Sequence, residues 1–150
     1  VDNSSIQNKY QMQKLMFFLK KIEPMLKKYK VQILFESDFE PRKLLKFIKK
    51  VNKRYFGINY DTGNSAALKY NFDREMIYYK FIKNIHLKDR SLNGLSKRFG
   101  SGNTNFFKII NFLKKKNYKG NLIFQSALPV NKDPINEFNY NLNFIKKLIK

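Results

Sequence analysis

The sequence contains no cysteine and only one histidine, His86. The lack of cysteine excludes disulfide bonds and thiolate metal sites, so any bound metal must use oxygen and imidazole ligands. No run of about 18 apolar residues is present, so no membrane span is indicated. Residues 1–5 lack the basic and apolar segments of a signal peptide. We therefore expect a cytoplasmic location.

Acidic residues are scarce: 11 Asp and Glu stand against 31 Lys and Arg, which gives a formal net charge of +20. Such an excess is a feature of nucleic-acid-binding proteins. Here the lysines are spread along every predicted helix, and they accompany heavy use of Asn, Ile, Phe and Tyr, a bias that an AT-rich coding sequence produces. We interpret the charge as a solvated surface and do not expect nucleic acid as a partner. Acidic or phosphorylated ligands would still be attracted.

The pattern of apolar residues predicts one domain, residues 1–150, in which a helix precedes four strand–helix units. Short apolar runs predict strands at 31–35, 55–60, a segment ending near 86–88, and 121–124. Apolar residues at three- and four-residue steps predict helices at 5–28, 41–51, 73–83, about 106–113, and 138–148. Pro24 is expected to kink or interrupt the first helix, Pro41 to begin the second, and Asp73 to cap the third. Alternating strands and helices indicate a parallel sheet.

Four polar residues stand at the C-terminal ends of the predicted strands: Glu36, Asp61, His86 and Gln125. Glu36 and Asp61 are 25 residues apart, as are Asp61 and His86, which is about one strand, one helix and one returning strand. The carboxyl ends of parallel strands meet at one rim. Two carboxylates, an imidazole and an amide at that rim predict a site for a divalent metal. Simpler roles remain open: Glu36 could cap the next helix, and Asp61 could form a turn before Gly63.

Several motifs in this order resemble one family: Leu34-Phe35-Glu36-Ser37, Asn59-Tyr60-Asp61-Thr62-Gly63-Asn64, Ile85-His86-Leu87-Lys88-Asp89-Arg90, Gly100-Ser101-Gly102 and Tyr118-Lys119-Gly120. They resemble the C-terminal half of the xylose isomerase-like TIM barrels, which include sugar-phosphate isomerases and epimerases and the apurinic endonucleases. The resemblance implies an α/β fold: a partial (β/α)8 TIM barrel made of strands five to eight, preceded by a helix.

The resemblance also implies an activity, namely sugar or sugar-phosphate isomerisation or epimerisation by metal-assisted proton transfer next to a carbonyl. Glu36 would be both a metal ligand and the catalytic base, and Asp61, His86 and Gln125 would complete the site for Mn, Mg, Co or Zn. Asn64, Lys88, Arg90 and Arg98 would contact the substrate, the last from a glycine-containing loop whose N–H groups could bind phosphate. For Lys88, Arg90 and Arg98 the alternative interpretation is ordinary surface charge. For the loop the alternative is a tight turn.

Two positions depart from the family pattern. Gln125 stands where the family usually has a glutamate, and an amide can coordinate a cation but cannot exchange a proton near neutral pH. Asn64 stands where many members have a substrate-holding histidine. A non-catalytic, diverged half-barrel therefore remains an alternative. An apurinic endonuclease relative is a weaker alternative, because that activity uses a histidine-rich three-zinc cluster and this chain has one histidine.

Four strands are half of the family barrel. We therefore expect a truncated or split coding sequence, whose partner is a complementary N-terminal half-barrel, or a half-barrel that associates with itself. Its inner face is expected to be apolar and uncovered, and to carry Ile33, Phe35, Ile58, Tyr60 and Phe124.

Overall fold

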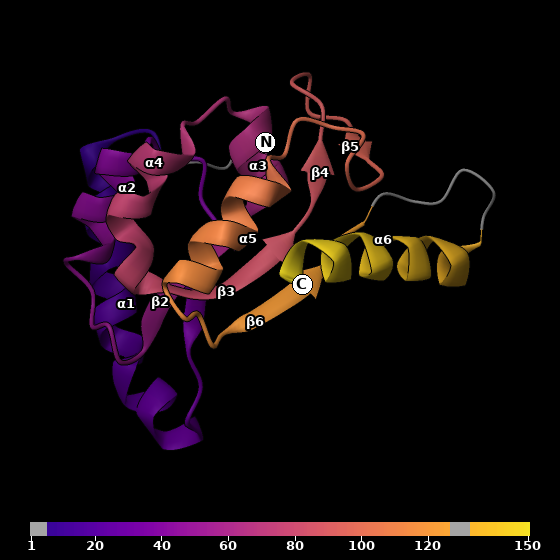
Figure 1. Ribbon diagram of the computed structural model, residues 1–150. Helices are drawn as coiled ribbons and strands as arrows, with labels where there is room; N and C mark the ends of the chain where they lie inside the picture. The colour runs from indigo at the N-terminus through magenta and orange to yellow at the C-terminus, as the bar shows by residue number, and fades with distance from the viewer. Residues whose placement is uncertain (1–5, 127–132) are drawn as a thin grey trace.

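The protein is an α/β structure built on one parallel sheet. The computed structural model describes residues 6–126 and 133–150. The sheet has the strand order β1-β2-β3-β6, with every neighbouring pair parallel. Its strands are β1 (Ile33–Phe35), β2 (Phe56–Asp61), β3 (Ile82–Leu87) and β6 (Asn121–Phe124). The prediction of four parallel strands in sequence order is thus confirmed (Figure 1).

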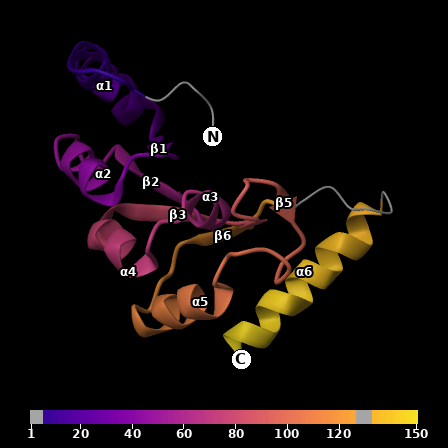
Figure 2. The same cartoon turned by 90° about the horizontal axis from the view of Figure 1, so that it is seen from above.

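Helical segments connect the strands and cover one face of the sheet. They are α1 (Lys9–Tyr29), α2 (Pro41–Ile48), α3 (Thr62–Ala67), α4 (Phe72–Glu75), the 3₁₀ helix η1 (Met76–Phe81), α5 (Phe106–Lys115) and α6 (Pro134–Ile149). Figure 2 shows α2, α4 and α5 along the same side of the sheet, with α1 beyond β1 and α6 at the other end. This is the arrangement of half of a (β/α)8 barrel.

The boundaries of the helices follow local capping groups. The side chain of Asn8 accepts a hydrogen bond from the Gln11 N–H at the start of α1, and Glu40 does the same for the Lys43 N–H at the start of α2. Pro41 occupies the first turn of α2, as predicted. The structure excludes an interruption at Pro24, because α1 runs through this residue as one helix.

The segment between β2 and β3 differs from the prediction. Residues 62–67 form α3 where a turn was expected, because the Asp61 side chain caps the N-terminus of this helix. The predicted helix at 73–83 is instead α4 followed by η1, and β3 already begins at Ile82. Its cap is Asn71, not Asp73, because the Asn71 side chain accepts from the N–H groups of Asp73 and Arg74.

Aromatic side chains build much of the core between the sheet and the helices. The ring of Phe35 in β1 lies 5.0 Å from that of Phe47 in α2 and 5.9 Å from that of Phe56 in β2, measured between centroids. At the other end of the sheet, the rings of Phe124 in β6 and Phe138 in α6 are 5.7 Å apart. The helix-facing side of the sheet is therefore apolar and covered.

This packing corrects the expectation of an uncovered apolar inner face. The five residues named for that face all pack in or against the core beneath the helices: Ile33, Phe35, Ile58, Tyr60 and Phe124. Because side chains of a strand alternate between its two faces, Glu36 and Asp61 point away from the helices when Phe35 and Tyr60 point toward them. Cross-strand partners share a face, and Asn59, Asn84 and Asn121 are such partners across β2, β3 and β6. The open face is therefore rich in polar groups.

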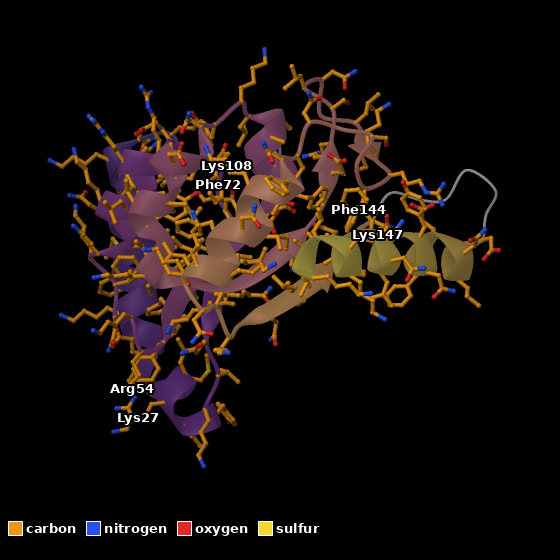
Figure 3. All side chains as sticks on the ribbon, viewed as in Figure 1. Lys27, Arg54, Phe72, Lys108, Phe144 and Lys147 are labelled. Carbon is orange, nitrogen blue, oxygen red and sulfur yellow. The ribbon has the colours of Figure 1, made fainter. Side chains whose placement is uncertain are left out.

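The cationic side chains extend from several sides of the molecule, as the nitrogen-tipped sticks in Figure 3 show. One of them, Lys108 of α5, forms an ion pair of 2.7 Å with Asp73 and lies 5.6 Å from the Phe72 ring centroid.

No helix in the described part of the chain is both long and apolar enough to cross a membrane.

The segment 89–103 contains a two-stranded ladder, β4 (Asp89–Arg90) with β5 (Ser96–Lys97), and it is organised by one buried carboxylate. Asp89 is fully buried. Its Oδ2 accepts from the N–H groups of Gly100 and Gly102, both at 2.9 Å, and its Oδ1 accepts from the Thr104 N–H at 3.0 Å. A Cβ at position 102 would lie 2.3 Å from Asp89 Oδ1, and Gly100 has φ of 85°. These glycines let the loop close around Asp89, so its N–H groups bind a carboxylate of the protein and not a phosphate.

We expect Asp89→Asn to lower the free energy of unfolding by about 2–4 kcal/mol, because one amide oxygen cannot accept from all three N–H groups and the new NH₂ group faces donors. Urea unfolding followed by circular dichroism measures this loss. The matched control is Asp73→Asn, whose side chain is 70% exposed and whose ion pair contributes little. Equal effects of the two substitutions would contradict the anchoring role of Asp89.

Candidate metal centre

Three side chains with metal-ligating atoms converge at the C-terminal ends of adjacent strands. Glu36 follows β1, Asp61 ends β2, and His86 lies near the end of β3, where it is the cross-strand partner of Asp61. One ligand atom from each residue lies within 4.8 Å of the other two. Parallel pairing in register is therefore enough to bring together residues that are 25 positions apart in the sequence.

The two carboxylate oxygens of Asp61 have different surroundings. Oδ1 accepts the Asn64 N–H at 2.7 Å and so caps α3. Oδ2 is buried and has no hydrogen-bond partner in the described part of the chain. Burial raises the pKa of Asp61 and the nearby Glu36 carboxylate raises it further, while the Asn64 hydrogen bond and the charges of Lys88 and His86 oppose the shift. The turn role and a ligand role are thus compatible, with one oxygen for each.

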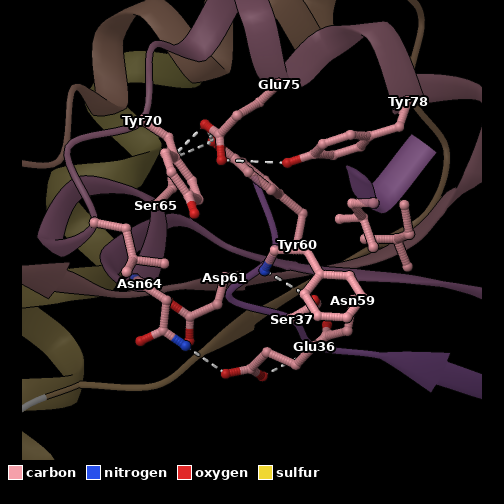
Figure 4. A pocket seen from close by; sticks show the side chains of 14 residues that line it. Glu36, Ser37, Asn59, Tyr60, Asp61, Asn64, Ser65, Tyr70, Glu75 and Tyr78 are labelled. Carbon is pink, nitrogen blue, oxygen red and sulfur yellow. Dashed lines mark hydrogen bonds between the residues drawn. The ribbon is translucent and has the colours of Figure 1, made fainter. Parts of the chain in front are cut away.

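Both oxygens of Glu36 are held by amide groups (Figure 4). Oε1 accepts from Asn64 Nδ2 at 2.5 Å, and Oε2 accepts from Asn59 Nδ2 at 3.0 Å. The side chain is 38% exposed, so substrate could reach it from the open face. It does not cap α2, since Glu40 does so. That alternative for Glu36 is wrong.

His86 faces the same group of atoms through Nδ1. This nitrogen lies 3.5 Å from Glu36 Oε2 and 3.1 Å from Asn59 Nδ2. The side chain is 24% exposed. The only histidine of the chain is therefore oriented with Nδ1 toward the Glu36 carboxylate.

The residues present fit a divalent cation. Two carboxylates and an imidazole are the oxygen and nitrogen ligands that Mg²⁺, Mn²⁺, Co²⁺ and Zn²⁺ accept. Leaving the buried Asp61 Oδ2 without a partner costs about 1–3 kcal/mol or more, and a cation would remove that cost. The unpartnered oxygen is the structural feature that points most directly to a metal.

Gln125, the fourth expected ligand, directly follows β6. Its backbone N–H donates to the Leu87 carbonyl at 2.9 Å, which places it level with the end of β3. Alternation puts it on the same face as Ile123, the cross-strand partner of His86, and its side chain is exposed. Gln125 therefore stands at the same end and on the same face of the sheet as the three converging residues.

The expected substrate-binding residues fall into two groups. Asn64 belongs to the centre itself, since its amide joins Glu36 to Arg90: Arg90 Nη1 donates to Asn64 Oδ1 at 2.5 Å. Arg90 Nε also donates to the Gly94 carbonyl at 2.7 Å. Lys88 is half-buried, and its charge acts on Asp61. These three residues lie around the centre.

Arg98 contacts α6 instead. Its Nε lies 3.2 Å from a Glu137 carboxylate oxygen, and its guanidinium carbon lies 3.5 Å from the centroid of the Tyr140 ring. The ion pair and the stacking on the ring attach the β5 loop to α6. The structure does not link Arg98 to the centre through any contact within the described residues.

A second buried carboxylate lies behind the centre, on the helix side of β2. Glu75 is 2% exposed and accepts hydrogen bonds from the hydroxyls of Ser65 at 2.5 Å, Tyr60 at 3.0 Å and Tyr78 at 3.2 Å. A cavity of about 20 Å³ between Glu75 and Glu36 is lined by both residues (Figure 4). Burial raises the pKa of Glu75 against the opposing effect of these three hydrogen bonds.

Sequence reasoning missed Asn59 and Glu75. Asn59 could have been found, because it is a polar residue in an apolar strand two positions before Asp61 and therefore on the same face. Glu75 gave no such signal, because its partners come from β2, α3 and η1 and meet only in the folded chain.

The chain was also compared with known proteins. The family model of the xylose isomerase-like TIM barrel matches residues 3–148. No curated protein matches the chain. Among solved structures, a xylose isomerase domain protein from Planctomyces limnophilus is 19% identical with a TM-score of 0.73, over 99% of this chain and 56% of that one.

Two epimerase structures are also similar. D-allulose 3-epimerase from a Methylomonas species is 15% identical with a TM-score of 0.76, over 98% of this chain and 59% of that one. D-psicose 3-epimerase from Clostridium cellulolyticum H10, solved with D-tagatose, is 13% identical with a TM-score of 0.68, over 100% of this chain and 61% of that one. The present chain therefore spans a little over half the length of these three structures.

Because the pKa of Glu75 is raised, the folded protein binds this proton more tightly than the unfolded chain does. The stabilisation from that proton is fully present below the unfolded pKa of about 4.3 and is lost as the pH rises through the folded pKa. We expect the stability of the wild type relative to Glu75→Gln to fall as the pH rises from about 4 to neutrality. Urea unfolding of both proteins across this range measures the difference. A difference that grows in favour of the wild type with rising pH would contradict the prediction.

Proposed function

Because the chain belongs to the xylose isomerase-like TIM barrel family, we propose that it is the metal-binding half of a sugar isomerase or epimerase. The observation that carries the proposal is the convergence of Glu36, Asp61 and His86, together with the unpartnered Oδ2 of Asp61. The similar solved structures named for D-allulose and D-psicose 3-epimerases support a sugar as the class of substrate.

In this proposal Glu36, Asp61 and His86 hold the cation, with Gln125 able to add an amide oxygen. A bound divalent ion would supply polarisation of the substrate carbonyl and of the oxygen beside it. Glu36 takes the proton from the carbon next to that carbonyl, which leaves an enediolate, and returns the proton to one of its two carbons. Donors on both oxygens of Glu36 fix the direction of its carboxylate.

The cationic residues favour an uncharged sugar over a sugar phosphate. Arg90 is bound to Asn64 and Gly94, and Arg98 is bound to Glu137 and Tyr140. The N–H groups of the glycine loop are bound to Asp89. Lys88 then remains as the substrate contact, and the Asn64 amide serves the catalytic carboxylate. We propose a ketose without a phosphate group at this end of the site.

A complementary half would complete the site. Among the described strands, β1 and β6 each have a single neighbour, and an unpaired edge is unfavourable. We propose that further strands, from an N-terminal half-barrel or from a second copy of this chain, cover the open face and its amide groups. The metal ligands named here all lie in this chain, so metal binding can be tested without that half.

We expect Asp61→Asn to separate metal binding from folding. Asparagine caps a helix as well as aspartate does, and the substitution removes a buried, desolvated charge, so the melting temperature without metal should stay equal or rise. Mn²⁺ should raise the melting temperature of the wild type, since a ligand of the folded state stabilises it, and should leave that of the variant unchanged. Thermal scans with and without Mn²⁺ give both numbers. Equal stabilisation of the two proteins by Mn²⁺ would exclude Asp61 as a ligand.

Glu36→Gln tests the base. In the completed barrel we expect it to reduce exchange of solvent deuterium into a ketose, beside the carbonyl, by at least about 10²-fold, because an amide accepts no proton. Mn²⁺ should still bind, because one side-chain oxygen remains, whereas His86→Ala should weaken Mn²⁺ binding itself. Exchange is read by NMR and metal binding by calorimetry.

The control for this experiment is Glu23→Gln, which changes a carboxylate on α1 that accepts a hydrogen bond from Asn52. It should leave both exchange and metal binding unchanged. Exchange at the original rate in Glu36→Gln would show that Glu36 is not the base and would refute the proposed mechanism.

A further inference from the structure

One amide group lies between the expected base and the expected imidazole ligand. Asn59 Nδ2 is 3.0 Å from Glu36 Oε2 and 3.1 Å from His86 Nδ1. Asn59 is 8% exposed and comes from the middle of β2, two residues before Asp61. It therefore contacts two of the three converging residues and is held by the sheet itself.

The orientation of this amide follows from its partners. An ionised carboxylate only accepts hydrogen bonds, so the group of Asn59 that faces Glu36 must be its NH₂. The carbonyl oxygen of Asn59 then points to Asn84, whose Nδ2 donates to it at 2.6 Å. Because the same NH₂ group faces His86, Nδ1 of the imidazole must be the acceptor. A neutral imidazole that accepts through Nδ1 carries its proton on Nε2.

Asn84 holds the Asn59 amide in this orientation but lowers the stability of the folded protein. Its Oδ1 is buried and has no hydrogen-bond partner among the described residues. An unsatisfied buried acceptor is unfavourable, and an apolar side chain of similar size would not carry that penalty. The donated hydrogen bond to Asn59 is the contact that distinguishes Asn84 from a leucine at this position.

We propose that Asn59, oriented by Asn84, is a positioning residue that keeps the proton of His86 on Nε2 and so leaves the Nδ1 lone pair directed at the Glu36 carboxylate. Nδ1 lies 3.5 Å from Glu36 Oε2. Without the donor from Asn59, the imidazole would carry its proton on Nδ1 and donate it to this carboxylate. Nδ1 could then not bind a cation, since a ligating nitrogen must be unprotonated. The consequence for metal binding rests on the proposed function, but the position of the proton does not.

The single histidine makes the proton position directly measurable. With ¹⁵N-labelled histidine, the full chain gives one Nδ1 and one Nε2 resonance, and their shifts distinguish a protonated from an unprotonated nitrogen. At about pH 8, where an ordinary histidine is neutral, we expect the metal-free wild type to show an unprotonated Nδ1. Asn59→Leu should move the proton to Nδ1. Asn84→Leu should move it in the same direction, without touching His86 or Glu36.

The matched control is Asn121→Leu. Asn121 is the cross-strand partner of Asn84 on the same face, is exposed, and lies on β6. It should leave the histidine resonances at their wild-type positions. Asn84→Leu also keeps the test decisive if Asn59→Leu does not fold, as judged by circular dichroism.

Calorimetry with Mn²⁺ provides the second readout. Loss of a residue that orients a metal ligand weakens metal binding by about 10–100-fold, and we expect this for Asn59→Leu and a smaller effect for Asn84→Leu. Asn121→Leu should bind Mn²⁺ like the wild type.

If Nδ1 stays unprotonated in both Asn59→Leu and Asn84→Leu, the proposal is overturned. Movement of the proton to Nδ1 in Asn121→Leu would also overturn it. If the wild type binds no Mn²⁺ but the proton moves as expected, the metal-dependent function fails while the positioning role of Asn59 stands. If Mn²⁺ binds with equal affinity to every variant and the proton does not move, Asn59 has no positioning role and the metal centre survives without it.

Discussion

Parallel pairing of four consecutive strands is the constraint on which both the core and the candidate centre depend. Successive side chains of a strand point to opposite faces of the sheet. The alternation that places Phe35 and Tyr60 under the helices therefore also directs their neighbours Glu36 and Asp61 to the open face. The register then sets Asp61 beside His86. A shift of one residue in any strand would expose the core and bury the centre at the same time. Folding and site assembly are therefore one requirement.

The centre combines charged groups that repel one another with donors that hold them in place. Glu36 raises the pKa of Asp61, so the two carboxylates interact unfavourably. Two chains of hydrogen bonds oppose this repulsion at Glu36: Arg90 to Asn64 to Oε1, and Asn84 to Asn59 to Oε2. In each chain the outer donor fixes the amide, and the amide fixes the carboxylate. A cation between the carboxylates would turn their repulsion into attraction.

Much of this fold could be predicted from the sequence, because its signals are local. The strand ends at Glu36, Asp61 and His86 and the first turn at Pro41 follow from apolar runs and from the chemistry of single residues. The assignment of faces failed because it treated apolar strand residues as inward-facing. Alternation from Glu36 and Asp61 gives the opposite face for Phe35 and Tyr60, so this error could have been avoided.

Other features could not be read from the sequence, because they depend on contacts between distant segments. Asp89 meets the N–H groups of Gly100, Gly102 and Thr104 only once the loop has closed. For that reason a Gly-x-Gly pattern that suits a phosphate equally suits a buried carboxylate. Replacement of the helix expected at 73–83 by α4 and η1 likewise places Glu75 under Tyr60 and Ser65. Tertiary contacts override local propensity at both places.

Under the proposed function, Gln125 limits the chemistry that the residues of this chain can perform. Its place at the end of β6, on the face of His86, would suit a second acid or base, but an amide exchanges no proton near neutral pH. Glu36 is then the one carboxylate of the centre that is exposed enough to meet a substrate, since Asp61 is buried and caps α3. A single base that removes and returns a proton on one side of an enediolate suffices for transfer between neighbouring carbons. Inversion at one carbon needs a second proton donor on the opposite side, and the three converging residues do not supply one. Under the proposed function, the titratable groups of this centre therefore favour isomerisation over inversion at one carbon.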